Sequence, residues 1–411
     1  MQKNIDSALS AEARSHLKSI SQADIIVGIP SYNNVLTATY VISQVISGLE
    51  THFPDKRSVI FISDGNSVDG TLTSVKTVNL PSKINLIPAV YVGVSGKGSA
   101  IKAIFEASTY LGVKAVALVD SDLCSITPEW MKLLVSPALS GTGLVVPYYS
   151  RRKYDGTITN FLCYPVTASL YGKEIRQPIG GDFGLSIDLV EELLASPLWK
   201  MKEVRSFGVD IFETHTALAK GFEVKQAFLG TKDHEPKDPA KQLSPMFRQV
   251  IGTMFTCIEH YEPVWKGIRG ISEIAGIGGP KHFSTQVPVQ VDLQNMIAIY
   301  KNGFSEHTHT YKSLLTEDIL KKLGQLQLEK HDNYFPPETW ARIVYSFIAG
   351  FHKAPISARE NLVDALRILW IGKVATFVKE TAEINVEEAE DKIKEEAKVF
   401  ENLKPYLMDH F

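Results

Sequence analysis

Cysteine is scarce in this sequence, and long apolar runs are missing. Cys124, Cys163 and Cys257 are the only three cysteines in 411 residues. An odd number at wide spacing fits neither a disulfide framework nor a zinc motif, so we expect reduced thiols in a cytoplasmic protein. No stretch of about 18 apolar residues occurs, and residues 1–21 lack the apolar core of a signal peptide. The sequence therefore predicts no membrane partner.

An excess of charge of either sign is also lacking. The chain has 43 basic and 46 acidic residues, for a net charge of −3. No nucleic acid partner is expected, because the whole chain lacks a basic field. Apolar residues make up 44% and charged residues 22%, which is ordinary for a globular protein. The length exceeds one usual core, so we predict an α/β domain over residues 1–266 and a mainly helical region over 267–411.

Strand-like and helix-like segments alternate in the first half of the chain. Apolar, β-rich runs predict strands at 24–30, 58–64, 84–92 and 114–120. Apolar residues at helical spacing predict helices at 37–53 and 97–111. This alternation predicts a mixed, mainly parallel sheet with helices on both faces. Ligands are then expected at the carboxyl ends of the strands.

The second half changes character. Strands are predicted at 143–149 and 222–229 and helices at 160–171 and 208–220, which continue the same sheet irregularly. Beyond residue 243 the pattern predicts helices at 244–266, 312–328, 337–351 and 361–381. The first of these either runs unbroken or is interrupted near Pro263. The Gly-rich segment 267–280 is interpreted as a linker. The amphipathic helices suggest a homodimer as a further hypothesis.

Asp120 and Asp122 form the sharpest local motif. They follow the apolar run Leu118-Val119, separated by one residue. If the strand continues, both carboxylates point to one side and suit Mg²⁺ or Mn²⁺. A solvated acidic turn is the alternative, and Asp-x-Asp alone favours it.

Three further positions place polar side chains near predicted strand ends. Asp64 is followed by Gly65 and could accept a hydrogen bond from a nucleoside, although Asp-Gly by itself favours an Asx-turn. Tyr32 could contact a base or simply pack. Lys97 lies between two glycines before a helix, where backbone amides attract anions, or it lies in an ordinary flexible turn.

Later motifs offer candidates for an acidic ligand and for a metal. His234 follows a predicted strand and is a competent metal ligand or an exposed loop histidine. Arg151 could bind a carboxylate as a fork or lie in a solvated turn. Gly180 and Gly181 would bring bare backbone close to a ligand, or form a tight turn. Asp210 could contact an acceptor or complement a helix dipole.

Taken in order, these segments resemble the GT-A class of nucleotide-sugar glycosyltransferases, specifically the retaining glucosyl-3-phosphoglycerate synthase and mannosylglycerate synthase families. The resemblance covers residues 24–248. It is carried by Pro30-Ser31-Tyr32, Ser63-Asp64-Gly65, Gly96-Lys97-Gly98, Asp120-Ser121-Asp122, Gln177-Pro178-Ile179-Gly180-Gly181, Gly208-Val209-Asp210 and His234.

The resemblance implies roles residue by residue. Asp122 and His234 are similar to the metal ligands, with Asp120 supporting the ribose and the metal. Arg151 and Thr159 match the pair that binds the acceptor, and Asp210 matches the acidic residue that orients acceptor or sugar. The carbonyl of Ile179, with Gly180 and Gly181, would lie near the reacting sugar. The nucleoside wall would be Pro30, Tyr32, Asp64 and Lys97.

Two departures from the family pattern stand out. Asp182 replaces the usual glutamate after the glycine pair, and Arg152 and Lys153 add charge beside Arg151. The added charge indicates either a phosphorylated acceptor or a different loop.

The resemblance implies transfer of glucose or mannose, with retention, from a nucleotide diphosphate sugar to glycerate or 3-phosphoglycerate, assisted by Mg²⁺ or Mn²⁺. An inverting GT-A transferase would instead use Asp182 or Asp210 as general base. Sugar-1-phosphate nucleotidylyltransfer is a third reading, but Pro30-Ser31-Tyr32 replaces its Gly-rich loop after the first strand. A nucleotide-sugar-binding scaffold is the non-enzymic alternative. The sequence does not choose the sugar, the base, the acceptor or the metal.

Overall fold

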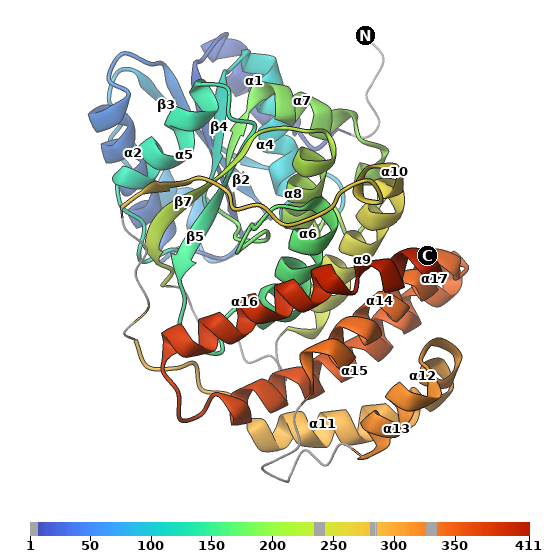
Figure 1. Ribbon diagram of the computed structural model, residues 1–411. Coiled ribbons are helices and arrows are strands. Elements are labelled where there is room, and N and C mark those ends of the chain that lie inside the picture. Colours follow the sequence, from blue (N-terminus) through green and yellow to red (C-terminus); the bar gives the residue numbers. More distant parts are fainter. Residues whose placement is uncertain (1–6, 234–242, 280–283, 285, 326–334) are drawn as a thin grey trace. The chain divides into compact units, whose positions relative to one another are not determined.

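The computed structural model describes residues 7–233, 243–279, 284, 286–325 and 335–411 (Figure 1). The chain divides into two compact units. The first comprises the described parts of 1–150, 179–234 and 274–282, and the second those of 151–178, 235–273 and 283–411. Within the described ranges, no helix is both long and apolar enough to cross a bilayer.

The first unit is built on a sheet of eight strands, counted over the described residues, in the order β3-β2-β1-β4-β6-β5-β7-β8. The strands are β1 (Ile25–Ser31), β2 (Ser58–Asp64), β3 (Ile84–Val90), β4 (Ala115–Leu118), β5 (Leu144–Ser150), β6 (Gly184–Ser186), β7 (Val224–Thr231) and β8 (Gly276–Gly278). Every adjacent pair is parallel except those that β6 makes with β4 and β5. The predicted mixed, mainly parallel sheet is confirmed.

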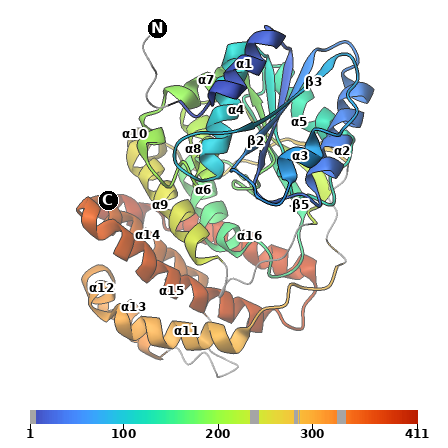
Figure 2. The same ribbon diagram turned by 180° about the vertical axis from the view of Figure 1, so that it is seen from behind.

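Helices cover both faces of this sheet (Figures 1 and 2). They are α1 (Ala11–Ile20), α2 (Ala38–His52), α3 (Thr71–Val75), α4 (Lys97–Leu111), α5 (Glu129–Leu139), α7 (Ile187–Ala195), the 3₁₀ turn η2 (Pro197–Lys200) and α8 (Val209–Ala219). Strand alternation decides which side each residue serves. Val27 belongs to the buried cluster shared with α2 and α5, whereas Gly28 faces α4. A Cβ atom at Gly28 would lie 2.4 Å from Ile104, so glycine allows the close approach of α4.

The second unit is helical. Its elements are the π-helical turn η1 (Thr159–Cys163), α6 (Tyr164–Tyr171), α9 (Ser244–His260), α10 (Glu262–Trp265), α11 (Leu293–Glu306), α12 (Thr308–Leu314), α13 (Glu317–Gln325), α14 (Pro337–Lys353), α15 (Ile356–Glu380), α16 (Val386–Asn402) and α17 (Lys404–His410). Trp340 of α14 and Trp370 of α15 are fully buried. Lys373 and Glu396 form a buried ion pair that joins α15 to α16. The predicted helical C-terminal region is confirmed.

Several predicted segments end differently from expectation. The helix predicted at 244–266 is interrupted at Tyr261, just before Pro263, and the one at 312–328 is broken between α12 and α13. The predicted linker 267–280 contains β8, which pairs with β7. The domain boundary predicted at residue 266 stays a prediction. The compact units instead group 151–178 and the described part of 235–273 with the C-terminal helices.

Candidate active site

The carboxyl ends of β1 and β2 meet at Asp64. This side chain is fully buried. It accepts hydrogen bonds of 2.7 Å from Ser31 Oγ, Ser67 N and Ser67 Oγ. Asp64 therefore closes the turn after β2 and ties it to the end of β1, as the Asx-turn alternative expected. Its predicted contact with a nucleoside stays a prediction.

The loop after β1 connects this region to the Asp-x-Asp motif. Tyr32 is 63% exposed and Pro30 is half-buried. The Asn34 side chain accepts from Tyr32 N at 3.0 Å and from Ser121 Oγ at 2.7 Å. Thr37 Oγ1 also donates to the Ser121 carbonyl at 2.7 Å. An exposed aromatic ring thus stands on a loop that is fixed to residue 121.

The two aspartates of the motif occupy different surroundings. Strand β4 ends at Leu118, and residues 121–122 form a turn. The expectation that strand alternation places both carboxylates on one side is therefore wrong, because the strand ends before either of them. Asp120 points into a cluster of charged side chains. Asp122 is exposed to solvent.

Two lysines hold the carboxylate of Asp120. Lys97 Nζ lies 2.9 Å from Oδ1, and Lys232 Nζ lies 3.1 Å from Oδ2. Burial opposes ionisation of this carboxyl, but the two ammonium groups outweigh burial and hold the pKa of Asp120 well below its usual range. Asp120 is therefore a permanent anion clamped between two cations.

Lys232 belongs to the same cluster, although the sequence did not mark it as a candidate. Its ammonium donates to Asp182 Oδ2 at 2.9 Å and to the Gly180 carbonyl at 2.9 Å, in addition to Asp120. It also lies 5.0 Å from the centre of the Tyr149 ring. The signal was available, since Lys232 lies at the end of β7 two residues before His234, but a single lysine there has no motif of its own.

Asp182 is the most enclosed carboxylate of the cluster, with no exposed surface. It accepts from Asp120 N at 2.8 Å, from Lys232, and from the Tyr149 hydroxyl in a short hydrogen bond. Burial raises the pKa of Asp182, and Lys232 opposes that rise. Asp182 is built into the cluster as a structural acceptor. Its predicted catalytic role stays a prediction.

The glycine pair brings bare backbone against the charged cluster, as expected. Gly181 has φ +89°, and a Cβ atom there would lie 2.7 Å from Asp120 Oδ2 and 3.1 Å from Lys97 Nζ. Gly180 contributes its carbonyl to Lys232. Both the left-handed backbone and the close approach require glycine at 181. Ile179 immediately precedes the pair at the start of this segment.

Lys97 links Asp120 to helix α8. Its ammonium lies 3.4 Å from Asp210 Oδ1. Burial raises the pKa of Asp210, with Lys97 opposing. Glu213, one turn further along α8, is fully buried, and neither of its oxygens has a hydrogen-bond partner among the described residues. Burial, reinforced by Asp210, raises the pKa of Glu213 well above its usual range.

The amino end of α4 is already occupied. Gly98 N donates to the Ser206 carbonyl and Ser99 N to the Arg205 carbonyl, each at 3.0 Å. A Cβ atom at Gly98 would lie 1.9 Å from the Val204 carbonyl. The expectation that these amides face an anionic ligand is therefore wrong, because they hold the loop before α8. The Lys97 side chain is what α4 contributes to the cluster.

The loop that carries Asp122 is bound to the segment that leads to His234. Cys124 N donates to the Asp233 carbonyl at 3.1 Å, and Asp233 N donates to Ser125 Oγ at 2.9 Å. No hydrogen bond or ion pair to the Asp122 side chain occurs among the described residues. His234 itself lies outside them. Over the described part of the chain, no group of three or more His, Cys, Asp or Glu side chains could hold a metal.

The predicted acceptor residues belong to the second unit. Arg151 follows directly on β5. Its Nε donates to Gln177 Oε1 at 3.1 Å, and its Nη1 donates to Asp155 Oδ2 at 3.1 Å. Thr159 begins the η1 turn and is only 3% exposed. No contact joins Thr159 to Arg151 among those the structure gives, and their shared role stays a prediction.

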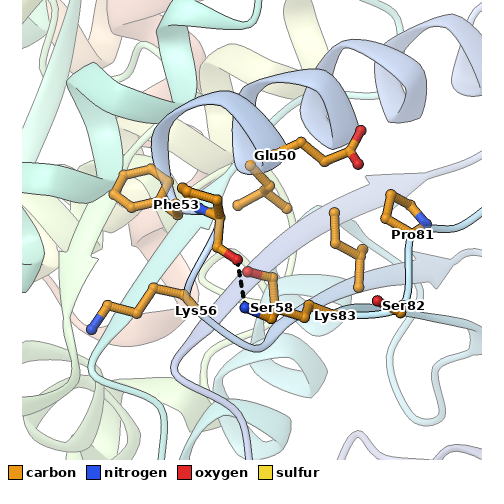
Figure 3. Close-up of a pocket in the computed structure, with 10 residues that line it drawn as sticks. Glu50, Phe53, Lys56, Ser58, Pro81, Ser82 and Lys83 are labelled. Atoms are coloured by element: carbon orange, nitrogen blue, oxygen red, sulfur yellow. Dashed lines mark hydrogen bonds between the residues drawn. The ribbon is translucent and has the colours of Figure 1, made fainter.

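A separate surface pocket lies at the amino ends of β2 and β3. It is lined by Phe53 and Glu50 near the end of α2, and by Ser58 and Ile84 at the first residues of β2 and β3 (Figure 3). These are the amino ends of the strands, whereas ligands of parallel sheets bind at the carboxyl ends. The pocket is therefore distinct from the charged cluster.

The mainly parallel sheet therefore carries the acidic motif after β4 and the glycine pair together at the carboxyl ends of its strands. Residues 67–254 match the family model described as the mannosylglycerate synthase GT domain. The chain is a distant homologue of the glucosyl-3-phosphoglycerate synthases.

Two curated relatives carry the name glucosyl-3-phosphoglycerate synthase. The protein from Mycobacterium tuberculosis is 27% identical over 252 residues, which are 56% of this chain and 72% of the relative. The protein from Mycolicibacterium paratuberculosis is 27% identical over 218 residues, covering 48% and 62%. A crystal structure of the M. tuberculosis enzyme with Mn²⁺, UDP and phosphoglyceric acid aligns with TM-score 0.46 and 25% identity, over 59% of this chain and 81% of the other.

Proposed function

We propose that this enzyme transfers glucose or mannose from a nucleotide diphosphate sugar to glycerate or 3-phosphoglycerate, with retention of the anomeric configuration. The family match over residues 67–254 and the shared name of the curated relatives support this class of substrate.

One observation carries the proposal further than the others. The backbone bond between Cys124 and Asp233 fixes the Asp122 loop against the residue that precedes His234. We propose that Asp122 and His234, which are more than a hundred positions apart in the sequence, bind one cation. Mg²⁺ and Mn²⁺ prefer carboxylate and phosphate oxygens, and a neutral imidazole can complete the set of ligands.

Of the two aspartates in the motif, only Asp122 has carboxylate oxygens that are suited to bind a divalent cation. Asp122 is exposed and has no partner among the described residues, so its oxygens are open for coordination. Each oxygen of Asp120 already accepts from an ammonium group, which repels a second cation. Asp122 would therefore bind the metal together with His234. Asp120 would support the ribose and the metal without binding the cation directly. A bound cation supplies charge neutralisation for a departing diphosphate.

The other proposed roles fall to residues of the charged cluster and to Arg151. Lys97 and Lys232 keep Asp120 ionised and fix it against Gly181. The Ile179 carbonyl, next to the glycine pair, is proposed to face the reacting carbon. Arg151 binds the carboxylate of the acceptor as a fork. Asp210 orients an acceptor or sugar hydroxyl, held in place by Lys97.

The surroundings of Asp182 argue against it as the general base of an inverting reaction. A general base must reach the proton that it removes. Asp182 has no exposed surface and its oxygens accept from Asp120 N, Lys232 and Tyr149. Asp210 is then the stronger candidate for a base in an inverting reaction. The anomeric configuration of the product, read by NMR, separates retention from inversion.

A substrate matrix tests the proposal. UDP-glucose, GDP-glucose, UDP-mannose and GDP-mannose are each combined with glycerate and 3-phosphoglycerate, in the presence of Mg²⁺, Mn²⁺ or a chelator. We expect a glycosylated acceptor in at least one combination and none with chelator. Absence of transfer in every combination, with folded protein and metal present, contradicts the proposal.

A further inference from the structure

The starting point is the pair of contacts that orient Arg151, the residue to which the proposed function assigns the acceptor. Its guanidinium lies between Gln177 on one side and Asp155 on the other, both at 3.1 Å. Arginine presents its donors in a rigid plane, so the direction of the fork depends on where these two partners stand. What fixes Gln177 and Asp155 therefore fixes the acceptor site.

Both partners are tied to Arg176. Gln177 is its immediate neighbour in the chain. On the other side, Arg176 Nη2 donates to Asn160 Oδ1 at 2.8 Å, and Asn160 Nδ2 donates to the Asp155 carbonyl at 3.0 Å. Arg176 and Asn160 are 5% and 4% exposed. Water therefore competes little for these bonds.

Arg176 in turn is held by the C-terminal helices. Its Nε and Nη2 donate to the two carboxylate oxygens of Glu390 in α16, at 2.7 and 2.8 Å. This is a bidentate pair, the strongest geometry that arginine and a carboxylate adopt. The Arg176 guanidinium also lies 5.1 Å from the ring centre of Tyr164. Loss of one partner of such an enclosed pair leaves the other charge uncompensated.

A second set of bonds anchors the same segment to α14 and α15. Lys153 Nζ donates to the carbonyls of Thr381 and Ile384, at 2.6 and 2.7 Å, just beyond the end of α15. Trp340 and Trp370 donate their indole N–H to the carbonyls of Phe161 and Thr157, at 2.8 and 3.3 Å. Lys153 is therefore bound to helix-end carbonyls and adds no free charge beside Arg151, which removes one sequence argument for a phosphorylated acceptor.

We infer that Glu390 of α16 is a positioning residue for the acceptor site, acting through Arg176 and Asn160 on the direction of the Arg151 guanidinium. Glu390 lies more than a hundred residues beyond the region that matches the family model, which ends at residue 254. The C-terminal helices would thus set the acceptor affinity of this enzyme. The inference rests on the proposed function, because it assigns Arg151 to the acceptor.

The test compares Glu390→Gln with Glu387→Gln in the full chain. Glu387 is an exposed residue in the first turn of the same helix, so its substitution removes the same charge without touching the network. With UDP-glucose and 3-phosphoglycerate, we expect Glu390→Gln to raise the KM for 3-phosphoglycerate by roughly ten- to a hundredfold. The KM for UDP-glucose stays unchanged, and Glu387→Gln behaves like wild type.

A merely structural role gives a different result. If Glu390→Gln only lowers the fraction of folded enzyme, kcat falls and both KM values stay as in wild type, which overturns the inference. Equal acceptor KM values for the two variants overturn it as well. Conservative rescue gives a positive control, since Glu390→Asp keeps the carboxylate and should recover part of the acceptor affinity.

A labelling experiment separates this inference from the proposed function. If wild type shows no transfer in any combination of donor and acceptor, the proposed function fails, and phenylglyoxal labelling of Arg151 then tests the network alone. Labelling at Arg151, followed by peptide mass spectrometry, should be faster in Glu390→Gln than in Glu387→Gln, with the half-exposed Arg57 as internal reference. Equal labelling rates at Arg151 overturn the inference.

Discussion

The amide of Cys124 donates to the carbonyl of Asp233 across 3.1 Å. This bond joins a loop two residues beyond Asp122 to a residue that adjoins His234, although more than a hundred positions separate them in the sequence. Asp233 N returns a bond to Ser125 Oγ at 2.9 Å. These two hydrogen bonds join the segments that follow β4 and β7.

Lys232 should be essential for the stability of the cluster. Its removal in Lys232→Met leaves Asp182 fully buried beside Asp120 without the shared ammonium, and we expect the free energy of unfolding to fall by about 3 kcal/mol. Chemical denaturation monitored by circular dichroism measures this change.

Lys225→Met, near the start of β7, is the matched control. Lys225 pairs with Glu223 at 3.4 Å on the surface, where both side chains retain solvent contact, so we expect a change below about 1 kcal/mol. Similar losses in the two variants would show that the Lys232 cluster is not a buried unit.

Gly181 should be intolerant of a side chain for two separate reasons. In Gly181→Ala the left-handed backbone costs about 1–2 kcal/mol, and the new methyl group meets Asp120 and Lys97. Gly141→Ala has a similar backbone, with φ +98°, and nothing within 4 Å. We expect both variants to lose stability in thermal melts, but only Gly181→Ala to lose glycosyl transfer. Full activity in Gly181→Ala contradicts the close approach that the structure gives.

His215 predicts acid sensitivity of the folded state. Burial lowers its pKa from 6.5 to about 3. Between these two values the unfolded chain binds a proton that the folded protein does not, so stability falls as the pH falls. The slope from this group is about 1.4 kcal/mol per pH unit.

Substitution of His215 isolates that contribution. In His215→Gln the free energy of unfolding should depend less on pH between about 6.5 and 4 than in wild type, by one bound proton. The exposed His16 provides the control, His16→Gln, which should keep the wild-type slope. Urea denaturation at several pH values gives the slopes, and identical slopes for wild type and His215→Gln refute the assignment.

The sequence predicts the sheet because buried parallel strands produce continuous apolar runs, and β1, β2 and β3 lie within one or two residues of their predicted positions. It fails at β8, where Gly276–Gly278 has the composition of a linker and becomes a strand only through pairing with β7. Pro263 marks the helix break at Tyr261 in the sequence, whereas the break after Leu314 was not predicted.

The candidate site shows the same division between local and long-range information. Asp64, Lys97, Asp120 and the glycine pair were found because short motifs mark them. Lys232 and Tyr149 carry no motif, and their roles arise from the meeting of β5 and β7 with the segment that follows Gly181. The Glu390 network was out of reach for the same reason, because it joins residues more than two hundred positions apart.

Metal binding tests the central proposal most directly. Binding of Mn²⁺ in the presence of UDP is measured by isothermal titration calorimetry for wild type, Asp122→Asn, His234→Gln and the double variant. If both side chains grip one cation, each single substitution should weaken Mn²⁺ affinity by at least about tenfold, and the double variant should lose little more than the worse single variant. Wild-type affinity in either single variant, or independent losses that add fully in the double variant, would contradict a shared cation.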